Sequence, residues 1–369
     1  MQAIFTSNTR IFGLDLVRAT AIICVLISHL YYVLNDYYPF LMMISGVFGY
    51  FGVELFFVLS GFLIGTILLD SFVNQAFSFS AVVNFLKRRW FRTLPAYYLV
   101  LVLNIIIAFW FQYDYNNVLK YFFFIQNFSY YDIGIFKESW SLSVEEWTYL
   151  SIPVLLLGIA QFFKTSRKKM FLALILLLIF MFHTIRYISY IQNPIKDLEI
   201  WNVTIKSVVI YRIDAILWGF IVAWCYKYYA VWLKKLSIYF FIIAVHLFLA
   251  QFLVLNVLGF TIVSSPVYFN VFYFTLTSVT ITMLLPVFVF WTKTIKWLQL
   301  PVTFISKISY SMYLLHYSII SVLLKYSFSY FNVTLSSVFI TVLYFSITIL
   351  LSYFLYTFFE KPIMNLRDK

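Results

Sequence analysis

Two side chains in the first apolar stretch, Arg18 and His29, could bind an anion and transfer a proton. They are eleven residues apart, which on an α-helix is about 20° past three full turns and about 16 Å along the axis. They therefore share one helix face, and Asp15 can pair with Arg18 on that face. A guanidinium binds anions, and an imidazole exchanges a proton near neutral pH. The alternative is that His29 packs against a neighbouring helix while Arg18 extends to a membrane interface.

A second group of cations, Arg88, Arg89 and Arg92, lies shortly before Pro95. Arg89 and Arg92 are three residues apart and share a face if the segment is helical. Guanidinium groups bind phosphate through paired hydrogen bonds, so this cluster is a candidate phosphate site. The alternative is an ordinary cationic loop that anchors the chain at the inner face of a membrane.

A third segment contains the carboxyl groups Glu145 and Glu146. Ser143 and Glu146 have the spacing of a capping box, in which the two side chains bond to backbone N–H groups at the start of a helix. This spacing predicts that a helix opens here and accounts for Glu146. Glu145 has no such structural role, and it is the better candidate for catalysis.

Further charged residues lie inside apolar stretches, where an ionisable group is costly and suggests function. Glu54 precedes Gly61 and Gly65, whose G-x-x-x-G spacing predicts a close helix–helix contact. Arg212 and Asp214 are two residues apart, so on a helix they point about 200° apart and cannot pair with each other. Each of them needs a partner on another element.

The composition indicates the elements that must position these side chains. The 369 residues are 63% hydrophobic and only 11% charged, with a net charge of +12. A soluble domain of this size carries roughly 25% charged residues, so a soluble protein is excluded. The apolar runs are long and continuous and do not alternate with period two, which argues against a β-barrel and predicts an all-α polytopic membrane protein. The net positive charge is then explained by cationic loops at the inner face of the membrane, and we expect no nucleic-acid partner.

Ten membrane-spanning helices are expected, at about 12–33, 46–69, 94–112, 142–162, 170–190, 207–226, 236–255, 270–291, 303–324 and 335–358. With the N-terminus inside, 18 of the 26 Lys and Arg residues fall in inside segments and five fall outside. The positive-inside rule therefore places both termini in the cytoplasm. Residues 1–369 are expected to form one membrane domain without a separate soluble domain. The apolar segment 118–128 is too short to cross, and we expect a lid or re-entrant piece on the outer face.

No metal-ligand spacing, Walker A motif or G-x-S-x-G elbow occurs in the sequence, so no metal site is expected. Seven segments instead form an ordered series from residue 14 to residue 362. They contain Asp15, Arg18 and His29; Glu54 and Ser60; Arg88, Arg89 and Arg92; Trp140, Ser143, Glu145 and Glu146; Arg212 and Asp214; Tyr310 and His316; and Glu360. This series resembles the acyltransferase 3 family of integral membrane, acyl-CoA-dependent O-acyltransferases.

The resemblance implies ten membrane helices and an arginine and histidine on the first of them, which match Arg18 and His29. It implies that His29 is catalytic, that Arg18 is its functional partner, and that Arg89 and Arg92 serve the acyl donor. Glu54 stands where the family more often has aspartate. We expect Glu145 or Asp214 to orient the imidazole of His29, as a carboxylate does in a catalytic triad.

The resemblance further implies acetyl-CoA as the donor substrate, with no permanently bound cofactor. Its phosphates would meet Arg88, Arg89 and Arg92. The acceptor would be a hydroxyl of a surface glycan or a lipid-linked sugar, approached from the outer side of a bacterial inner membrane. His29 could act as a general base or could first accept the acyl group itself. The alternative function is a transporter or flippase of a lipid-linked sugar, which also uses buried charges.

Overall fold

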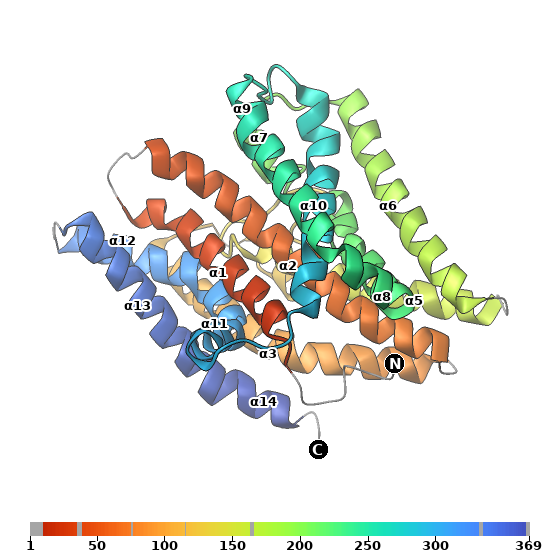
Figure 1. Cartoon of the computed structure of the whole chain (residues 1–369). Coiled ribbons are helices and arrows are strands. Elements are labelled where there is room, and N and C mark those ends of the chain that lie inside the picture. The colour runs from red at the N-terminus through yellow and green to blue at the C-terminus, as the bar shows by residue number, and fades with distance from the viewer. Residues whose placement is uncertain are drawn as a thin grey trace.

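The computed structural model describes residues 10–34, 39–74, 77–114, 116–162, 166–331 and 335–366. Every regular element in these ranges is a helix, which confirms the expected all-α membrane protein. The long helices lie side by side in one bundle, with α1 next to α2 and α11 (Figure 1). The start of α1 and the last helix, α14, both lie on the lower side of this view.

The helices follow one another with short connections. The α-helices are α1 (Phe12–Val33), α2 (Pro39–Asn74), α3 (Phe79–Phe111), α4 (Leu119–Phe122), α5 (Ser139–Phe162), α6 (Arg167–Gln192), α7 (Leu198–Val203), α8 (Ile213–Leu249), α9 (Leu255–Val257), α10 (Tyr273–Phe290), α11 (Lys296–Leu315), α12 (Val322–Tyr330), α13 (Ser337–Leu355) and α14 (Lys361–Leu366). A 3-10 helix, η1 (Val209–Tyr211), precedes α8. Four π-helical turns are η2 (Ala250–Val254), η3 (Tyr268–Phe272), η4 (His316–Ser321) and η5 (Tyr356–Glu360).

Eight helices among the described residues are long and apolar enough to cross a membrane. The expected spans 207–226 and 236–255 lie within one continuous helical stretch, Ile213–Val254. The expected span 303–324 falls in α11, η4 and the start of α12, and it is not among these eight helices. That the chain crosses the membrane ten times, and that both termini lie in the cytoplasm, stay predictions.

The chain reverses direction within α8, at Tyr229, where the backbone is non-helical (φ −134°, ψ 33°). Before the reversal, α8 follows α2: Arg212, just ahead of it, pairs with Glu54, and Lys227 pairs with Asp70. After it, Phe248 lies back beside Phe51, with ring centroids 4.8 Å apart. The predicted spans 207–226 and 236–255 are therefore separated in the structure, by a sharp kink at Tyr229 and not by a loop.

The predicted G-x-x-x-G contact joins α2 to α8. A Cβ atom added at Gly61 would overlap the carbonyl oxygen of Ile216. One added at Gly219 on the facing helix would overlap the carbonyl oxygen of Val58. Because neither residue has a side chain, the two backbones approach closely, as small residues allow in membrane helices. This contact fixes where the first half of α8 lies against α2.

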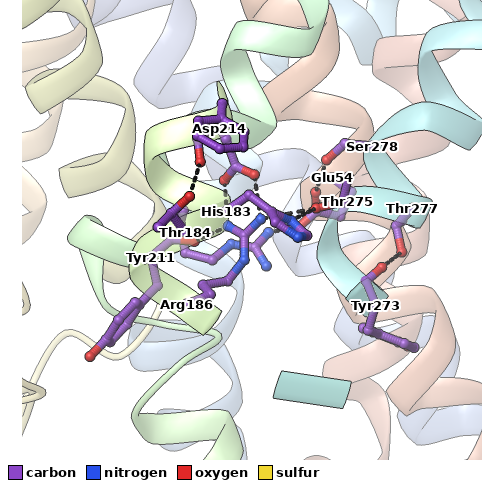
Figure 2. A network of polar contacts seen from close by, with 12 residues as sticks. Glu54, His183, Thr184, Arg186, Tyr211, Asp214, Tyr273, Thr275, Thr277 and Ser278 are labelled. Carbon is purple, nitrogen blue, oxygen red and sulfur yellow. Dashed lines mark hydrogen bonds and ion pairs between the residues drawn. The ribbon is translucent and has the colours of Figure 1, made fainter. Parts of the chain in front are cut away.

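Two buried ion pairs link α2, α6 and α8 (Figure 2). Arg186 of α6 donates two hydrogen bonds to Asp214, at 2.8 and 2.6 Å, and both side chains are buried. Arg212 pairs with Glu54, and both side chains are fully buried. Each of Arg212 and Asp214 thus has its partner on another helix, as their spacing predicts. Such pairs are costly to bury, and removing one member would be strongly destabilising because the other charge would be left buried and unpaired.

The segment expected to be a lid or re-entrant piece, 118–128, packs between α3 and α5. The hydroxyl of Tyr97 in α3 donates to the carbonyl oxygen of Tyr121 at 2.9 Å. The indole N–H of Trp147 in α5 donates to the carbonyl oxygen of Phe124, also at 2.9 Å. Gln126 and Asn127 are fully buried, and their amides bind α5 and the loop before η1. The segment is therefore tied into the bundle on several sides.

Candidate active site

Helix α1 carries Arg18 and His29 without interruption, so the predicted pair shares one helix. Arg18 approaches Asp15 only at 4.0 Å. Asp15 is bound more closely by Arg10, which donates to it at 2.8 and 2.5 Å, and by the hydroxyl of Ser306 at 2.7 Å. Because these groups satisfy Asp15, the guanidinium of Arg18 keeps most of its capacity to bind an anion.

A cavity with about 850 Å³ of space, including its open mouth, lies beside Arg18. Arg89 and Arg92 of α3 also line it, which brings together three of the predicted cations. Its remaining lining is mostly apolar or hydroxyl-bearing, and the carboxyl group among its lining residues belongs to Glu145. Arg88 is exposed and does not line the cavity, so the structure separates it from Arg89 and Arg92.

A chain of hydrogen bonds crosses the cavity wall from α5 to α2. The hydroxyl of Tyr149 donates to Glu145 at 2.8 Å, and it lies 2.5 Å from the hydroxyl of Ser60. The interaction of Arg89 with the ring of Tyr149, 6.0 Å from its centroid, adds a cation to this wall. Sequence analysis missed Tyr149, although it lies four residues after Glu145 and hence on the same helix face.

The capping box predicted for Ser143 and Glu146 is absent, because α5 begins four residues earlier, at Ser139. The hydroxyl of Ser143 accepts a hydrogen bond from the amide of Gln126 at 2.8 Å. Glu146 accepts one from the hydroxyl of Thr93 in α3 at 3.0 Å. The two side chains join α5 to its neighbours and do not cap a helix end. Tyr310 lies on the same cavity wall and donates to the carbonyl oxygen of Thr93 at 2.8 Å.

Several motif residues hold helices together beyond the cavity. The carbonyl oxygen of Trp140 accepts a hydrogen bond from Asn127 at 3.0 Å, and its ring packs on Phe57. Glu360 is buried in η5 and accepts a hydrogen bond from the hydroxyl of Ser311 in α11. Trp140 and Glu360 do not themselves line the cavity, although Phe57 does.

His29 lies towards the other end of α1, half-buried, with another histidine against it. Its Nδ1 atom is 3.2 Å from Nε2 of His316, which is fully buried in η4. The ring of Tyr317 also packs on the imidazole, at 4.4 Å between centroids. His316 belongs to one of the sequence motifs, but no local pattern could show that it meets a residue 287 positions away.

The expectation that Glu145 or Asp214 orients the imidazole of His29 is not met in the structure. Asp214 is occupied by Arg186, and Glu145 by Tyr149. The residues that line the cavity include Tyr313 but not His29. Tyr313 links the two parts of the site, because its ring also lies 5.7 Å from that of His316. The cavity and the histidine pair thus share a neighbour in Tyr313.

Glu138 is a buried carboxyl group near the histidine pair that sequence analysis did not identify. It precedes α5 and accepts hydrogen bonds from the backbone N–H and the hydroxyl of Ser318 in η4, at 3.0 and 2.8 Å. Burial raises the pKa of Glu138 to about 7, although the hydrogen bonds from Ser318 oppose this shift. Glu138 therefore holds η4 in place while staying largely protonated below neutral pH.

This shift predicts how stability depends on pH. In the unfolded chain the carboxyl group of Glu138 ionises near its ordinary pKa of 4.5, whereas in the folded protein it keeps its proton up to about 7. Between these values the folded state binds the extra proton, so the free energy of unfolding falls as pH rises, by at most about 1.4 kcal/mol per pH unit. Melting of purified protein in detergent at pH 5 and pH 7 measures the change. Glu138→Gln should flatten it, and an unchanged slope in that variant would contradict the assignment.

Among the described residues, no group of three or more His, Cys, Asp or Glu side chains is arranged to hold a metal ion. The described part of the site consists of the cavity lined by Arg18, Arg89 and Arg92, the neighbouring side chain of Tyr313, and the histidine pair His29 and His316.

Comparison with known proteins gives this arrangement its family. The chain is 31% identical over 172 residues to the peptidoglycan O-acetyltransferase OatA of Listeria monocytogenes, which is 42% of this chain and 25% of that protein. It is 29% identical over 175 residues to the putative peptidoglycan O-acetyltransferase YrhL of Bacillus subtilis, covering 43% of this chain and 25% of that protein. The O-acetyltransferase OatA of Staphylococcus aureus is 28% identical over 167 residues, 41% of this chain and 26% of that protein.

These alignments span about a quarter of each relative's length. No solved structure matches the chain. A family model described as an acyltransferase domain matches residues 11–357, which is nearly the whole sequence. It contains the cavity, the histidine pair and the first six of the seven sequence motifs, while Glu360 lies just beyond it, and the chain therefore belongs to this acyltransferase family.

Proposed function

We propose that this membrane acyltransferase moves an acetyl group from acetyl-CoA to a hydroxyl group of a glycan. The observation that carries the proposal is the placement of two chemistries on one helix: Arg18 lines an arginine-rich cavity, and His29, with a half-buried imidazole, lies further along the same helix. The names of the relatives support O-acetyl transfer to a glycan, since all three are O-acetyltransferases and two are named for peptidoglycan.

The cavity suits a polyanionic thioester. Arg89 and Arg92 would bind the phosphates of the donor, because planar guanidinium groups make paired hydrogen bonds with phosphate oxygens. The largely apolar walls further in would hold the uncharged arm that carries the acetyl group. The positive-inside rule places Arg89 and Arg92 at the cytoplasmic side of a bacterial inner membrane, where acetyl-CoA is available.

The chemical step needs a base for the acceptor hydroxyl. We propose that His29 takes the hydroxyl proton as the oxygen attacks the thioester carbonyl. The C–S bond then breaks, the acetyl group remains on the acceptor oxygen, and the thiolate leaves with the proton that His29 returns. Covalent transfer through the imidazole is the second route, with the same overall balance. In either route Tyr313 would lie beside the reacting groups, because it lines the cavity and its ring is 5.7 Å from that of His316.

The acceptor would approach His29 from the end of α1 opposite the arginines. Aromatic rings lie there: Tyr317 packs on His29, and Tyr32 packs on Tyr317 with 5.3 Å between centroids. Flat aromatic faces suit the apolar faces of sugar rings. The family match supports acyl transfer and gives no support to the transporter or flippase alternative.

The proposal is tested with purified protein in detergent or vesicles. Acetyl-CoA and a peptidoglycan fragment are supplied, and free thiol and acetylated product are measured together. We expect thiol release that depends on the acceptor and equals the product formed. Thiol release without acceptor, at the same rate, would show hydrolysis instead. The absence of turnover with peptidoglycan, lipid-linked and capsular sugars alike would refute glycan acetylation.

Arg89, which lines the cavity, and its exposed neighbour Arg88, which does not, provide a matched test of the donor site. Arg89→Gln should raise the KM for acetyl-CoA by roughly tenfold or more, since a charge-assisted hydrogen bond contributes about 1.5–3 kcal/mol. Arg88→Gln removes the same charge one residue earlier, at an exposed position outside the cavity, and should leave KM within about twofold. Equal effects of the two substitutions on KM would mean that the overall charge of this part of α3 matters and that the cavity is not the donor site.

A further inference from the structure

The Nδ1 atom of His29 has three close neighbours. They are the carbonyl oxygen of Val25 at 3.1 Å, the hydroxyl of Ser28 at 3.1 Å and Nε2 of His316 at 3.2 Å. A carbonyl oxygen can only accept a hydrogen bond. The hydroxyl of Ser28 gives its own proton to the carbonyl of Val25, at 2.6 Å, so it presents lone pairs to the imidazole. Two of the three neighbours therefore require a proton on Nδ1 of His29.

The third neighbour depends on the tautomer of His316, which the fold also determines. Nδ1 of His316 lies 2.8 Å from the carbonyl oxygen of Tyr313, three residues earlier in the chain. Because this oxygen only accepts, Nδ1 of His316 carries the proton. In a neutral imidazole the other nitrogen then has a lone pair, and that nitrogen, Nε2, is the one that faces His29.

We propose that His316 is a positioning residue that fixes the tautomer and the ring orientation of His29, so that Nε2 of His29 is the unprotonated nitrogen available as the base. This inference rests on the proposed function for its catalytic consequence, and on hydrogen-bond geometry alone for the tautomer. A neutral histidine thus has the place that a carboxylate holds in a Ser-His-Asp triad. When Nε2 of His29 takes up a proton, His316 still accepts the proton on Nδ1 and stabilises the imidazolium.

The backbone around His316 explains how it reaches His29. η4 is a wide π-helical turn that begins at His316, and such turns often lie at functional sites. Widening the turn releases backbone groups from the regular helix pattern. The N–H of Ser318 finds its partner in the buried carboxyl group of Glu138, at 3.0 Å. The hydroxyl of Tyr313, near the end of α11, donates a hydrogen bond to the backbone carbonyl oxygen of Glu138 at 3.1 Å. Glu138 thus braces the turn that presents His316.

Two substitutions at His316 separate positioning from packing. His316→Gln retains an amide oxygen that can accept the proton of Nδ1, whereas His316→Leu fills similar space with no acceptor. We expect His316→Leu to lower kcat by roughly 10–100-fold, the range typical of losing a residue that orients a functional histidine. The KM for acetyl-CoA should stay within about twofold, because His316 does not line the donor cavity. His316→Gln should recover most of the lost kcat.

The tautomer is measured without turnover. The chain has four histidines, so the ¹⁵N resonances of His29 in labelled protein can be identified by their loss in His29→Ala. We expect a protonated Nδ1 and an unprotonated Nε2, with the Nδ1 signal displaced in His316→Leu and largely restored in His316→Gln. The opposite tautomer overturns the inference, as does equal kcat in the leucine and glutamine variants. If the wild-type protein has the expected tautomer but no transferase activity, only the proposed function fails.

Discussion

Replacing His29 with alanine is expected to abolish acetyl transfer while leaving the protein folded. The imidazole is half-buried and is the base that the described site offers beside the cavity and the aromatic rings. General-base catalysis by a positioned histidine contributes about 10²–10⁴-fold, and the whole of this factor is lost with the ring. The measurement is acceptor-dependent release of thiol from acetyl-CoA, compared at equal amounts of monodisperse protein.

A second histidine provides the control. His246 is exposed on α8, and its Nδ1 atom lies 2.8 Å from the carbonyl oxygen of Ile242 on the same helix. His246→Ala removes a ring of the same size far from the site, so kcat should stay within about twofold. If His29→Ala turned over at the wild-type rate, His29 could be neither the general base nor the acyl carrier. A loss of folded protein in His29→Ala would be visible as a shifted gel-filtration profile and would be separated from a catalytic defect in that way.

Gly219→Ala is expected to cause a large loss of stability. The new Cβ would overlap the carbonyl oxygen of Val58 and lie 2.5 Å from the backbone nitrogen of Phe62. Both atoms are backbone, so no side chain can turn away, and α2 and α8 must separate. Overpacking of this kind costs about 1–3 kcal/mol or more. We expect a lower melting temperature and a lower yield of monodisperse protein in detergent.

Gly158→Ala is the matched control, because a Cβ at this position in α5 has no neighbour within 4 Å. In a helix interior alanine is favoured over glycine by about 1 kcal/mol, so this variant should be as stable as the wild type or more stable. Two variants that differ only in position would then change stability in opposite directions. Equal melting temperatures for Gly219→Ala and the wild type would show that α2 and α8 do not meet as described.

Sequence patterns predict much of this fold because membrane helices follow from local apolar length. The helical class, the close contact at Gly61 and the separate partners of Arg212 and Asp214 follow from composition, residue size and helical periodicity. The break between 226 and 236 is present as the reversal at Tyr229. The prediction that Ser143 caps the start of this helix was wrong, because Ser143 has a tertiary partner in Gln126 and α5 begins at Ser139. Local propensity cannot show such a partner.

The site was harder to predict than the fold. Arg18 and His29 are near in sequence, so helix geometry places them together on α1. The partner of His29 comes from η4, and the partner of Glu145 is Tyr149, which also meets Ser60 on another helix. Meetings between distant segments depend on how whole helices pack, and a wide turn such as η4 shifts every residue after it around the helix. The structure brings Arg89 and Arg92 together with Arg18 in one cavity and leaves Arg88 outside it, and the role of these residues in donor binding stays a prediction.

The buried ion pairs have a consequence for the order in which the chain is made. Glu54 leaves the ribosome long before Arg212, so this carboxyl group enters the bilayer without its partner. Arg186 waits a shorter time, since Asp214 follows 28 residues later. A charged side chain at the centre of a bilayer costs about 2.5–3.5 kcal/mol during insertion. Both pairs can therefore form only once the start of α8 has been made, because Arg212 lies just ahead of this helix and Asp214 lies in its first turn.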